Sequence, residues 1–217
     1  MSAQTKPVVV LIHGVWLHGL VMRYLARSLQ KHFFLKTYQF NYPSTHQDLA
    51  ADARELNAFL GSLEAEVVHL VGHSLGGLVI RALFHYYPNQ APGRLVMLGS
   101  PARGSYVAAV LQRSWLGRRI VGPALAQYLQ EGVLWQPLPR ELGTIAGSIA
   151  LGFGRLFPGL PRPNDGTVAV SETQTVDASD HIVLPVSHTS MLFSPQVARQ
   201  VGIFLTQGQF DRLESDR

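Results

Sequence analysis

The 217-residue chain contains no cysteine. This absence excludes disulfide bridges, thiolate-bound zinc, iron–sulfur clusters and a cysteine nucleophile. Charged residues are also scarce, at 15%, whereas 47% of the residues are hydrophobic. A chain with so much apolar material buries a core, so intrinsic disorder is excluded. The length fits one domain, and we expect it to span residues 1–217.

Long apolar runs are missing as well. No stretch reaches the roughly 18 apolar residues that a membrane-spanning helix needs. The run from Pro7 to Ile12 ends at His13-Gly14, short of the roughly 7–15 apolar residues of a secretory signal. We therefore interpret this run as the first core strand and expect a cytoplasmic protein.

The net charge of +4 comes from 18 Lys and Arg residues, mostly arginine, against 14 acidic residues. A basic balance permits a nucleic-acid or anionic-lipid partner. The arginines are scattered, however, and Arg118-Arg119 is the only adjacent pair. Since no recognition-helix or RNA-platform signature accompanies them, we expect no nucleic-acid partner. No feature of the sequence indicates an oligomeric state.

Apolar runs typical of buried strands alternate with segments of helical periodicity along the chain. Because such alternation favours parallel strands joined by crossover helices, we predict an α/β fold of about six mostly parallel strands, with helices on both faces. The expected strands are 7–12, 33–40, 66–71, 95–98, 144–150 and 182–186, and the main helices are 18–31, 49–60, 75–87 and 195–205.

The segment from about residue 102 to residue 140 interrupts this alternation, since it has helical apolar patterns but no strand. An insertion of that size between consecutive strands often lines or covers a site. Two interpretations stay open: a cap-like insertion, or an extra pair of helices packed on the core.

The pentapeptide Gly72-His73-Ser74-Leu75-Gly76 lies where a Val-rich strand ends and a helix begins. A serine on such a sharp turn has a strained backbone, so neighbouring glycines are needed to let strand and helix approach. Short motifs occur by chance, but here the strand and the helix stand on the correct sides. We predict that Ser74 is a nucleophile.

A serine nucleophile needs a histidine base. Open α/β sheets place their ligands at the carboxyl ends of the strands, and His188 lies just beyond the last expected strand. We therefore predict His188 as the base. His181 precedes that strand and lies at the opposite edge, and His69 and His73 are expected to be packed in the third strand. The remaining histidines are expected at helix ends, on the surface or, for His13, in a structural role.

The base in turn needs an orienting acid. Asp165 lies in the polar turn Asn164-Asp165-Gly166-Thr167 after the fifth expected strand, again at the carboxyl edge. We predict Asp165 as this acid, although an ordinary Asp-Gly turn would look the same. Asp177 and Glu172 are weaker candidates, and Asp180 neighbours His181 at the wrong edge.

A tetrahedral intermediate also needs hydrogen-bond donors for its oxyanion. The backbone N–H of Leu75, at the positive end of the helix that follows Ser74, is one predicted donor. The second is expected from the loop after the first strand, where Gly14 permits close approach. We choose the N–H of Val15, with that of Trp16 as the alternative.

The His13-Gly14 loop, the Gly-His-Ser-Leu-Gly-Gly elbow, the Asn-Asp-Gly-Thr-Val turn and Ser187-His188 together resemble the α/β-hydrolase superfamily. Within it, they are similar to the small bacterial lipase/esterase branch. The resemblance covers roughly residues 7–205 and implies a Ser/Asp/His hydrolase acting on carboxylic esters. Residues 189–194 contain no acid and cysteine is absent, so neither the calcium site nor the secretion of larger relatives is carried over.

We therefore expect an esterase- or lipase-like enzyme that cleaves a small-molecule acyl ester or a lipid and uses no cofactor and no metal. Trp16 is the predicted substrate-pocket residue. Further candidates for an apolar acyl pocket are Leu17, Trp115, Phe153, Met191 and Leu192.

Three alternatives stay open. A thioesterase or acyltransferase would use the same three residues, with Arg113, Arg118 and Arg119 binding a phosphorylated carrier. A lipid hydrolase would contact a membrane surface peripherally through the cap. A non-catalytic binding protein on this scaffold would normally have lost one of the three residues, and none is missing here.

Overall fold

The computed structural model describes residues 7–131, 136–152 and 156–212. Six strands form one sheet in the order β2-β1-β3-β4-β5-β6, and every neighbouring pair is parallel. The strands are β1 (Val8–Ile12), β2 (Lys36–Phe40), β3 (Val68–His73), β4 (Leu95–Leu98), β5 (Leu142–Gly147) and β6 (Asp180–Leu184). The predicted α/β class with a parallel sheet is confirmed.

The central strands are apolar throughout because both faces of the sheet are covered. All five residues of β1 are buried. Alternate side chains of a strand point to opposite faces, so Val8, Val10 and Ile12 pack in one core cluster, while Val9 and Leu11 pack in another. This single apolar strand therefore contributes side chains to two hydrophobic cores.

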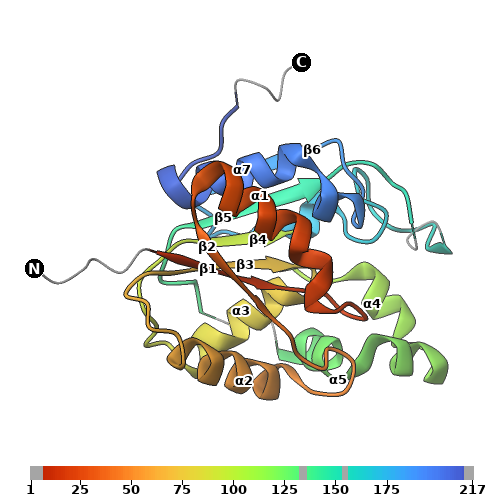
Figure 1. Ribbon diagram of the computed structural model, residues 1–217. Helices are drawn as coiled ribbons and strands as arrows, with labels where there is room; N and C mark the ends of the chain where they lie inside the picture. The colour runs from red at the N-terminus through yellow and green to blue at the C-terminus, as the bar shows by residue number, and fades with distance from the viewer. Residues whose placement is uncertain (1–6, 132–135, 153–155, 213–217) are drawn as a thin grey trace, which may run out of the picture.

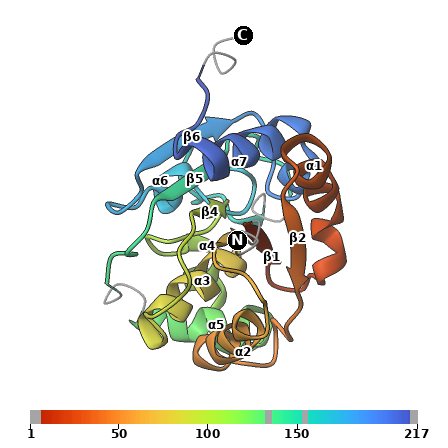
Figure 2. The ribbon, with the colours of Figure 1, turned by 60° about the vertical axis from the view of Figure 1, so that its left-hand side comes forward.

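Helices lie on both sides of the sheet, as Figures 1 and 2 show: α2, α3 and α5 cover one face, and α1 and α7 cover the other. The helices are η1 (Gly19–Met22), α1 (Arg23–Phe33), α2 (Leu49–Gly61), α3 (Leu75–Tyr86), α4 (Tyr106–Leu111), α5 (Trp115–Glu131), α6 (Val170–Thr173), η4 (Ser190–Phe193) and α7 (Pro195–Gln207). None of those in the described part of the chain is long and apolar enough to cross a membrane.

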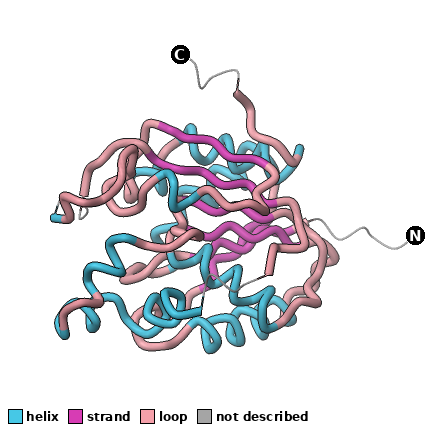
Figure 3. The backbone as a smooth tube through the Cα atoms, turned by 180° about the vertical axis from the view of Figure 1, so that it is seen from behind, coloured by secondary structure: helices cyan, strands magenta, loops and turns pink. Residues whose placement is uncertain are grey.

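The order of the strands creates one place where consecutive connections leave the sheet on opposite faces. From β1 the chain passes over the α1 face to β2, and it returns through α2 on the other face to β3. Such a switch point opens a crevice beyond the carboxyl ends of the two strands. Those ends are followed by the His13–His18 loop and by Ser74. Figure 3 shows the sheet between the two helical layers, with long loops beyond the carboxyl ends at the left.

The last two strands begin and end two or more residues earlier than the sequence suggests. We expected 144–150 and 182–186, whereas the strands are Leu142–Gly147 and Asp180–Leu184. The expectation for β6 was wrong because β6 is an edge strand, where polar residues such as Asp180 and His181 are tolerated. His181 therefore lies within the strand rather than before it.

The segment between β4 and β5 holds the two helices α4 and α5 and, among its described residues, no strand of the sheet, as the sequence indicated. Its long helix is divided at Gly122, whose φ of 73° and ψ of 169° are not helical, and Pro123 follows. The part after the division packs on α2 and places Ala124 and Tyr128 in the core. The part before it lies further out, at the carboxyl ends of the strands (Figure 1).

Candidate active site

Ser74 stands alone between a strand and a helix. Strand β3 ends at His73, helix α3 begins at Leu75, and Ser74 has a φ of 54° and a ψ of −118°. Residues other than glycine rarely adopt this conformation, which costs on the order of 1–3 kcal/mol. A backbone hydrogen bond from the Ser74 N–H to the carbonyl oxygen of Leu98, 2.9 Å long, helps to hold the turn. The strained elbow predicted from the pentapeptide is present.

Glycines make this turn sterically possible. A Cβ on Gly72 would lie 2.5 Å from the backbone nitrogen of Gly77, and one on Gly76 would lie 2.4 Å from the carbonyl oxygen of Ile12. A Cβ on Gly77 would meet the Ser100 Oγ at 2.1 Å. Helix α3 therefore touches β1, β3 and the chain after β4 through bare backbone, and any side chain at these positions would push it away.

His188 and Asp165 meet beyond the carboxyl ends of β5 and β6. The Nδ1 of His188 lies 2.7 Å from the Oδ2 of Asp165, and the His188 backbone N–H donates to the Asp165 carbonyl oxygen at 2.8 Å. The other carboxylate oxygen accepts hydrogen bonds from the N–H groups of Thr167 and Val168, at 2.9 and 2.7 Å. Both carboxylate oxygens of Asp165 thus have hydrogen-bond partners, and the carboxylate fixes the orientation of the His188 ring.

The ends of the neighbouring strands leave room for this pair. Gly99 follows β4 with a φ of +54°, and a Cβ there would lie 3.0 Å from the Asp165 Oδ2 and 3.1 Å from the His188 Nδ1. A Cβ on Gly147 would lie 2.7 Å from the Asp165 Cβ. Sequence reasoning did not single out either glycine, because their role depends on contacts between distant segments.

The other acids considered from the sequence are engaged elsewhere. Asp177 forms a buried ion pair with Arg81 at 2.7 Å, and Asp180 accepts a hydrogen bond from the Phe210 N–H at 2.7 Å. Glu172 accepts hydrogen bonds from the N–H groups of Tyr106 and Ala169. Within the described residues, the His188–Asp165 pair is the only close contact between a histidine ring and a carboxylate.

His73 packs against His188, in line with its expected structural role. The two rings are 4.7 Å apart, and the His73 Nε2 lies 3.0 Å from the His188 carbonyl oxygen. Burial, together with the nearby His188, lowers the pKa of His73 to about 3. The His73 ring is therefore neutral at ordinary pH, and its N–H at Nε2 donates to that carbonyl oxygen. This bond ties the loop that carries His188 to the end of β3.

The loop after β1 is fixed from behind by His13 and Tyr42. The His13 Nδ1 lies 2.8 Å from the Gly14 carbonyl oxygen, and the Tyr42 hydroxyl donates to the His13 carbonyl oxygen at 2.8 Å. The two rings stack with centroids 4.5 Å apart. Burial lowers the pKa of His13, which favours the neutral ring. His13 is thus a structural residue that shapes the loop carrying Val15.

Gly14 brings this loop directly over the elbow. A Cβ on Gly14 would lie 3.0 Å from the Ser74 Cβ and 3.1 Å from the His73 Nδ1. Val15 follows at once, and Leu75 is the first residue of α3, where a backbone N–H has no acceptor within the helix. The two predicted oxyanion donors therefore belong to the segments that flank Ser74, one on each side.

A buried carboxyl group lies behind the same loop. Asp52, on α2, is completely buried, and neither of its side-chain oxygens has a hydrogen-bond partner within the described residues. Burial, together with the nearby charges of Glu55 and Asp48, raises the pKa of Asp52 to about 7. The pKa of Tyr42 is raised by burial and by Asp52, so the tyrosine hydroxyl remains a donor to the loop.

Two cavities open at Ser74, and both are lined by Val15, Trp16, Ser74 and Thr167. The larger, of about 230 Å³, also includes Gly14, Leu17, His73, Leu151, Gly152, His188, Thr189 and Leu192. The smaller, of about 60 Å³, extends under α4 and α5 and includes Pro101, Ser105, Val107, Ala108, Leu111, Val121, Leu125 and Val168. Ser74 therefore stands where two largely apolar cavities meet, and of the two only the larger is also lined by His188.

Some of the pocket residues expected from the sequence line these cavities, and others do not. Trp16, Leu17 and Leu192 line them, whereas Met191 and Trp115 do not. Met191 is buried in the core, and Trp115 is exposed. Phe153 lies outside the described residues. Sequence reasoning missed Thr167, although its position two residues after Asp165 was a usable signal.

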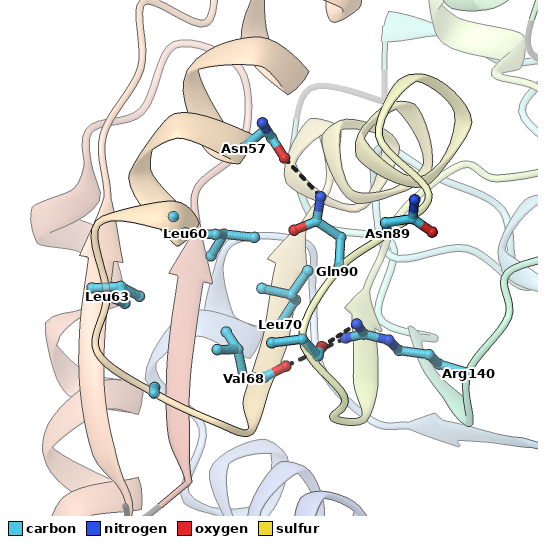
Figure 4. Close-up of a pocket in the computed structure, with 11 residues that line it drawn as sticks. Asn57, Leu60, Leu63, Val68, Leu70, Asn89, Gln90 and Arg140 are labelled. Atoms are coloured by element: carbon cyan, nitrogen blue, oxygen red, sulfur yellow. Dashed lines mark hydrogen bonds between the residues drawn. The ribbon is translucent and has the colours of Figure 1, made fainter.

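A separate hollow of about 310 Å³ lies at the opposite, amino-terminal end of β3, between the end of α2 and the chain after α3 (Figure 4). Its polar side chains are mostly bonded to the protein itself: Asn57 accepts from Gln90, and Arg140 donates to the Ala91 and Val68 carbonyl oxygens. Within the described residues, no three His, Asp or Glu side chains gather into a possible metal site. The chemistry-bearing residues thus concentrate around Ser74.

The buried Asp52 predicts a specific dependence of stability on pH. Its folded-state pKa lies above the ordinary value near 3.8, so the native state keeps a proton that the unfolded chain releases. Stability is therefore lost as the pH rises from about 4 to about 7. In urea unfolding, we expect wild type to lose about 1 kcal/mol per pH unit relative to Asp52→Asn in this range, and nothing more above about pH 8. Parallel stability curves for the two proteins would contradict the assignment.

Two solved structures of other proteins share the fold of this chain. The mature form of a Bacillus licheniformis lipase has a TM-score of 0.73 at 19% identity, covering 96% of this chain and 94% of the lipase. A metagenomic carboxyl esterase has a TM-score of 0.69 at 14% identity, covering 88% of this chain and 67% of that protein. At these identities, the two structures establish a shared fold.

Sequence comparison adds a relative and a family match. An uncharacterized protein of Mycobacterium tuberculosis is 24% identical over an alignment of 245 positions. The alignment covers 96% of this chain and 71% of that protein. The family model described as the alpha/beta hydrolase family matches residues 9–201. Because this match spans most of the chain and the sheet order agrees with it, the protein belongs to the alpha/beta hydrolase family.

Proposed function

We propose that the protein is a serine hydrolase that cleaves carboxylic esters, with Ser74 as nucleophile, His188 as general base and acid, and Asp165 as the residue that orients His188. The observation that carries the proposal is the shared cavity: Ser74 on its strained elbow and His188, held at 2.7 Å by Asp165, line the same space. The lipase and the carboxyl esterase that share the fold support an ester as the substrate class.

The proposed reaction has two halves. The Ser74 Oγ attacks the ester carbonyl carbon as the His188 Nε2 takes its proton, and the N–H groups of Val15 and Leu75 stabilise the oxyanion. Collapse breaks the bond to the alcohol, which leaves with the proton from His188. Water then attacks the acyl-enzyme, again giving a proton to His188, and the carboxylic acid is released as Ser74 recovers its proton.

The two cavities suggest how an ester is oriented. The leaving alcohol receives its proton from His188, so it must lie on the His188 side, in the cavity of about 230 Å³. The acyl chain then extends into the smaller space under α4 and α5, where side chains such as Val107, Leu111 and Leu125 are apolar. In this proposal, α4 and α5 act as the cap that the sequence suggested, and Trp16 borders both subsites.

The role of Ser74 has a direct test. We expect Ser74→Ala to lower kcat for nitrophenyl butyrate by roughly 10⁴–10⁶-fold, because the nucleophile is lost while the fold is kept. A fluorophosphonate probe should label Ser74 in wild type and leave the variant unmodified, as mapped by peptide mass spectrometry. Near wild-type turnover by Ser74→Ala would refute the proposal.

Ser74→Gly provides a control that does not depend on activity. Glycine tolerates a φ of 54° with a ψ of −118° without strain, so we expect this variant to be inactive yet more stable than wild type by about 1 kcal/mol. Chemical denaturation of the three proteins measures this difference. A Ser74→Gly protein less stable than wild type would show that the elbow is not strained.

Gly99 predicts a second, steric effect on the same reaction. A Cβ at Gly99 would press on both Asp165 and His188, so we expect Gly99→Ala to lower kcat/KM at least about tenfold. Gly104→Ala is the matched control, because Gly104 also has a positive φ, +105°, but no heavy atom lies within 4 Å of its ideal Cβ. Equal activities for the two variants would argue against the role of the Asp165–His188 contact.

A further inference from the structure

The first part of α5 carries an outward face that the protein does not cover. Trp115 and Leu116 are 67% and 55% exposed, although burial of large apolar side chains is favourable. On the other side of this segment, Gly117 packs against α4, where a Cβ would lie 2.0 Å from the Leu111 carbonyl oxygen, and Val121 is buried. The segment is thus fixed by its inner face and presents Trp115 outward.

Exposed arginines surround this tryptophan. Arg118 and Arg119 follow Trp115 at spacings of three and four residues, which places them on the same side of the helix. Arg113 precedes it on the connection from α4, and all three arginines are exposed. Among the described residues, none of the three forms an ion pair. The exposed start of α5, with Trp115 and Leu116, therefore also carries unpaired positive charge.

The sequence on either side of this segment contains no acidic residue that could pair with these arginines. Residues 67–130 include six arginines and no aspartate or glutamate. Two of the six, Arg81 and Arg94, pair with acids from elsewhere in the chain, Asp177 and Glu141. The other four are Arg103 and the three arginines around Trp115, and none of these four forms an ion pair among the described residues, so the three around Trp115 are available to an external partner of negative charge.

The same end of the molecule holds further exposed apolar side chains. Trp16 follows β1, Leu151 follows β5 and Phe193 lies in η4 after β6, and each is more than half exposed. All three therefore follow carboxyl ends of strands, the side on which α4 and the start of α5 also project (Figure 1). Trp16 and Leu151 line the cavity that contains Ser74. Grouped exposed apolar residues of this kind mark an interaction surface.

We propose that this surface, formed by Trp115, Leu116, Arg113, Arg118 and Arg119, docks the protein on an anionic phospholipid surface. Tryptophan favours the level of the lipid headgroups, and arginine binds their phosphates while its aliphatic stem remains in apolar surroundings. Trp16 and Leu151 at the cavity mouth turn the site toward the same surface. The orientation of the site rests on the proposed ester hydrolysis, whereas the docking itself does not.

The test uses the full-length Ser74→Ala protein, so that no lipid is hydrolysed during the measurement. Sedimentation with vesicles compares phosphatidylcholine alone with an equimolar mixture containing phosphatidylglycerol. We expect at least about tenfold stronger partitioning onto the anionic vesicles. This difference should be lost in about 1 M salt, where the screening length falls to about 3 Å.

Matched variants locate the surface. We expect Arg119→Gln and Trp115→Ser each to weaken partitioning about fivefold. Arg27→Gln, an exposed arginine on α1, and Phe34→Ser, an aromatic that is 84% exposed at the far end of α1, should leave it unchanged. Circular dichroism and thermal unfolding confirm that each variant is folded.

Equal partitioning onto both vesicle types, no partitioning onto either, or equal effects of the test and control variants would each overturn the docking proposal. The hydrolysis of a soluble nitrophenyl ester by wild type is measured separately and without vesicles. Loss of that activity would refute the proposed reaction and leave the docking result standing, so the two failures are distinguishable.

Discussion

The close approach of α3 to the sheet is the contact on which the site depends. Gly72 and Gly76 let the first turn of the helix touch the backbone of β1 and β3, with no room for a Cβ at either position. This approach holds Ser74 in a conformation that an isolated chain would avoid. The cost is offset by the packing of α3, nearly all of which is buried. The elbow therefore draws its rigidity from the core of the protein.

The remaining site residues reach Ser74 through the topology of the sheet. The switch point between β1 and β3 opens the crevice into which the His13–His18 loop projects. Asp165 and His188 come from connections on the other side of β4, and Gly99 and Gly147 leave the space that they occupy. His73 joins the two sides by bonding the His188 backbone. Residues from five connections thus converge because the strands are parallel and end at one edge.

The helices between β4 and β5 connect this site to the outer surface. Glu172 accepts hydrogen bonds from the first turn of α4 and from the segment next to Asp165, so the helix start and the acid turn are held by one side chain. The inner sides of α4 and α5 line an apolar cavity at Ser74. The outer side carries Trp115 and its arginines. One insertion thereby presents an apolar face inward and an amphipathic face outward.

The local sequence pattern was sufficient to predict the fold class and the central strands, because β1, β3 and β4 are buried on both faces. It also predicted the elbow, because the glycines of Gly72-His73-Ser74-Leu75-Gly76 let a strand and a helix approach closely. It was less sufficient at the edge, where β6 tolerates Asp180 and His181, and the bounds expected for β5 and β6 were too late by two or three residues. The sequence also predicted Asp165 and His188 as partners, and their side chains do lie 2.7 Å apart, while their catalytic roles stay a prediction. Several other acids and histidines had similar local settings. Only the tertiary structure distinguished them, since contacts such as Asp177 with Arg81, or Gly99 with the His188–Asp165 pair, join segments that are far apart in the chain. A sequence pattern reports what each residue does to its own backbone, whereas such partnerships exist only once the core has brought the strand ends together.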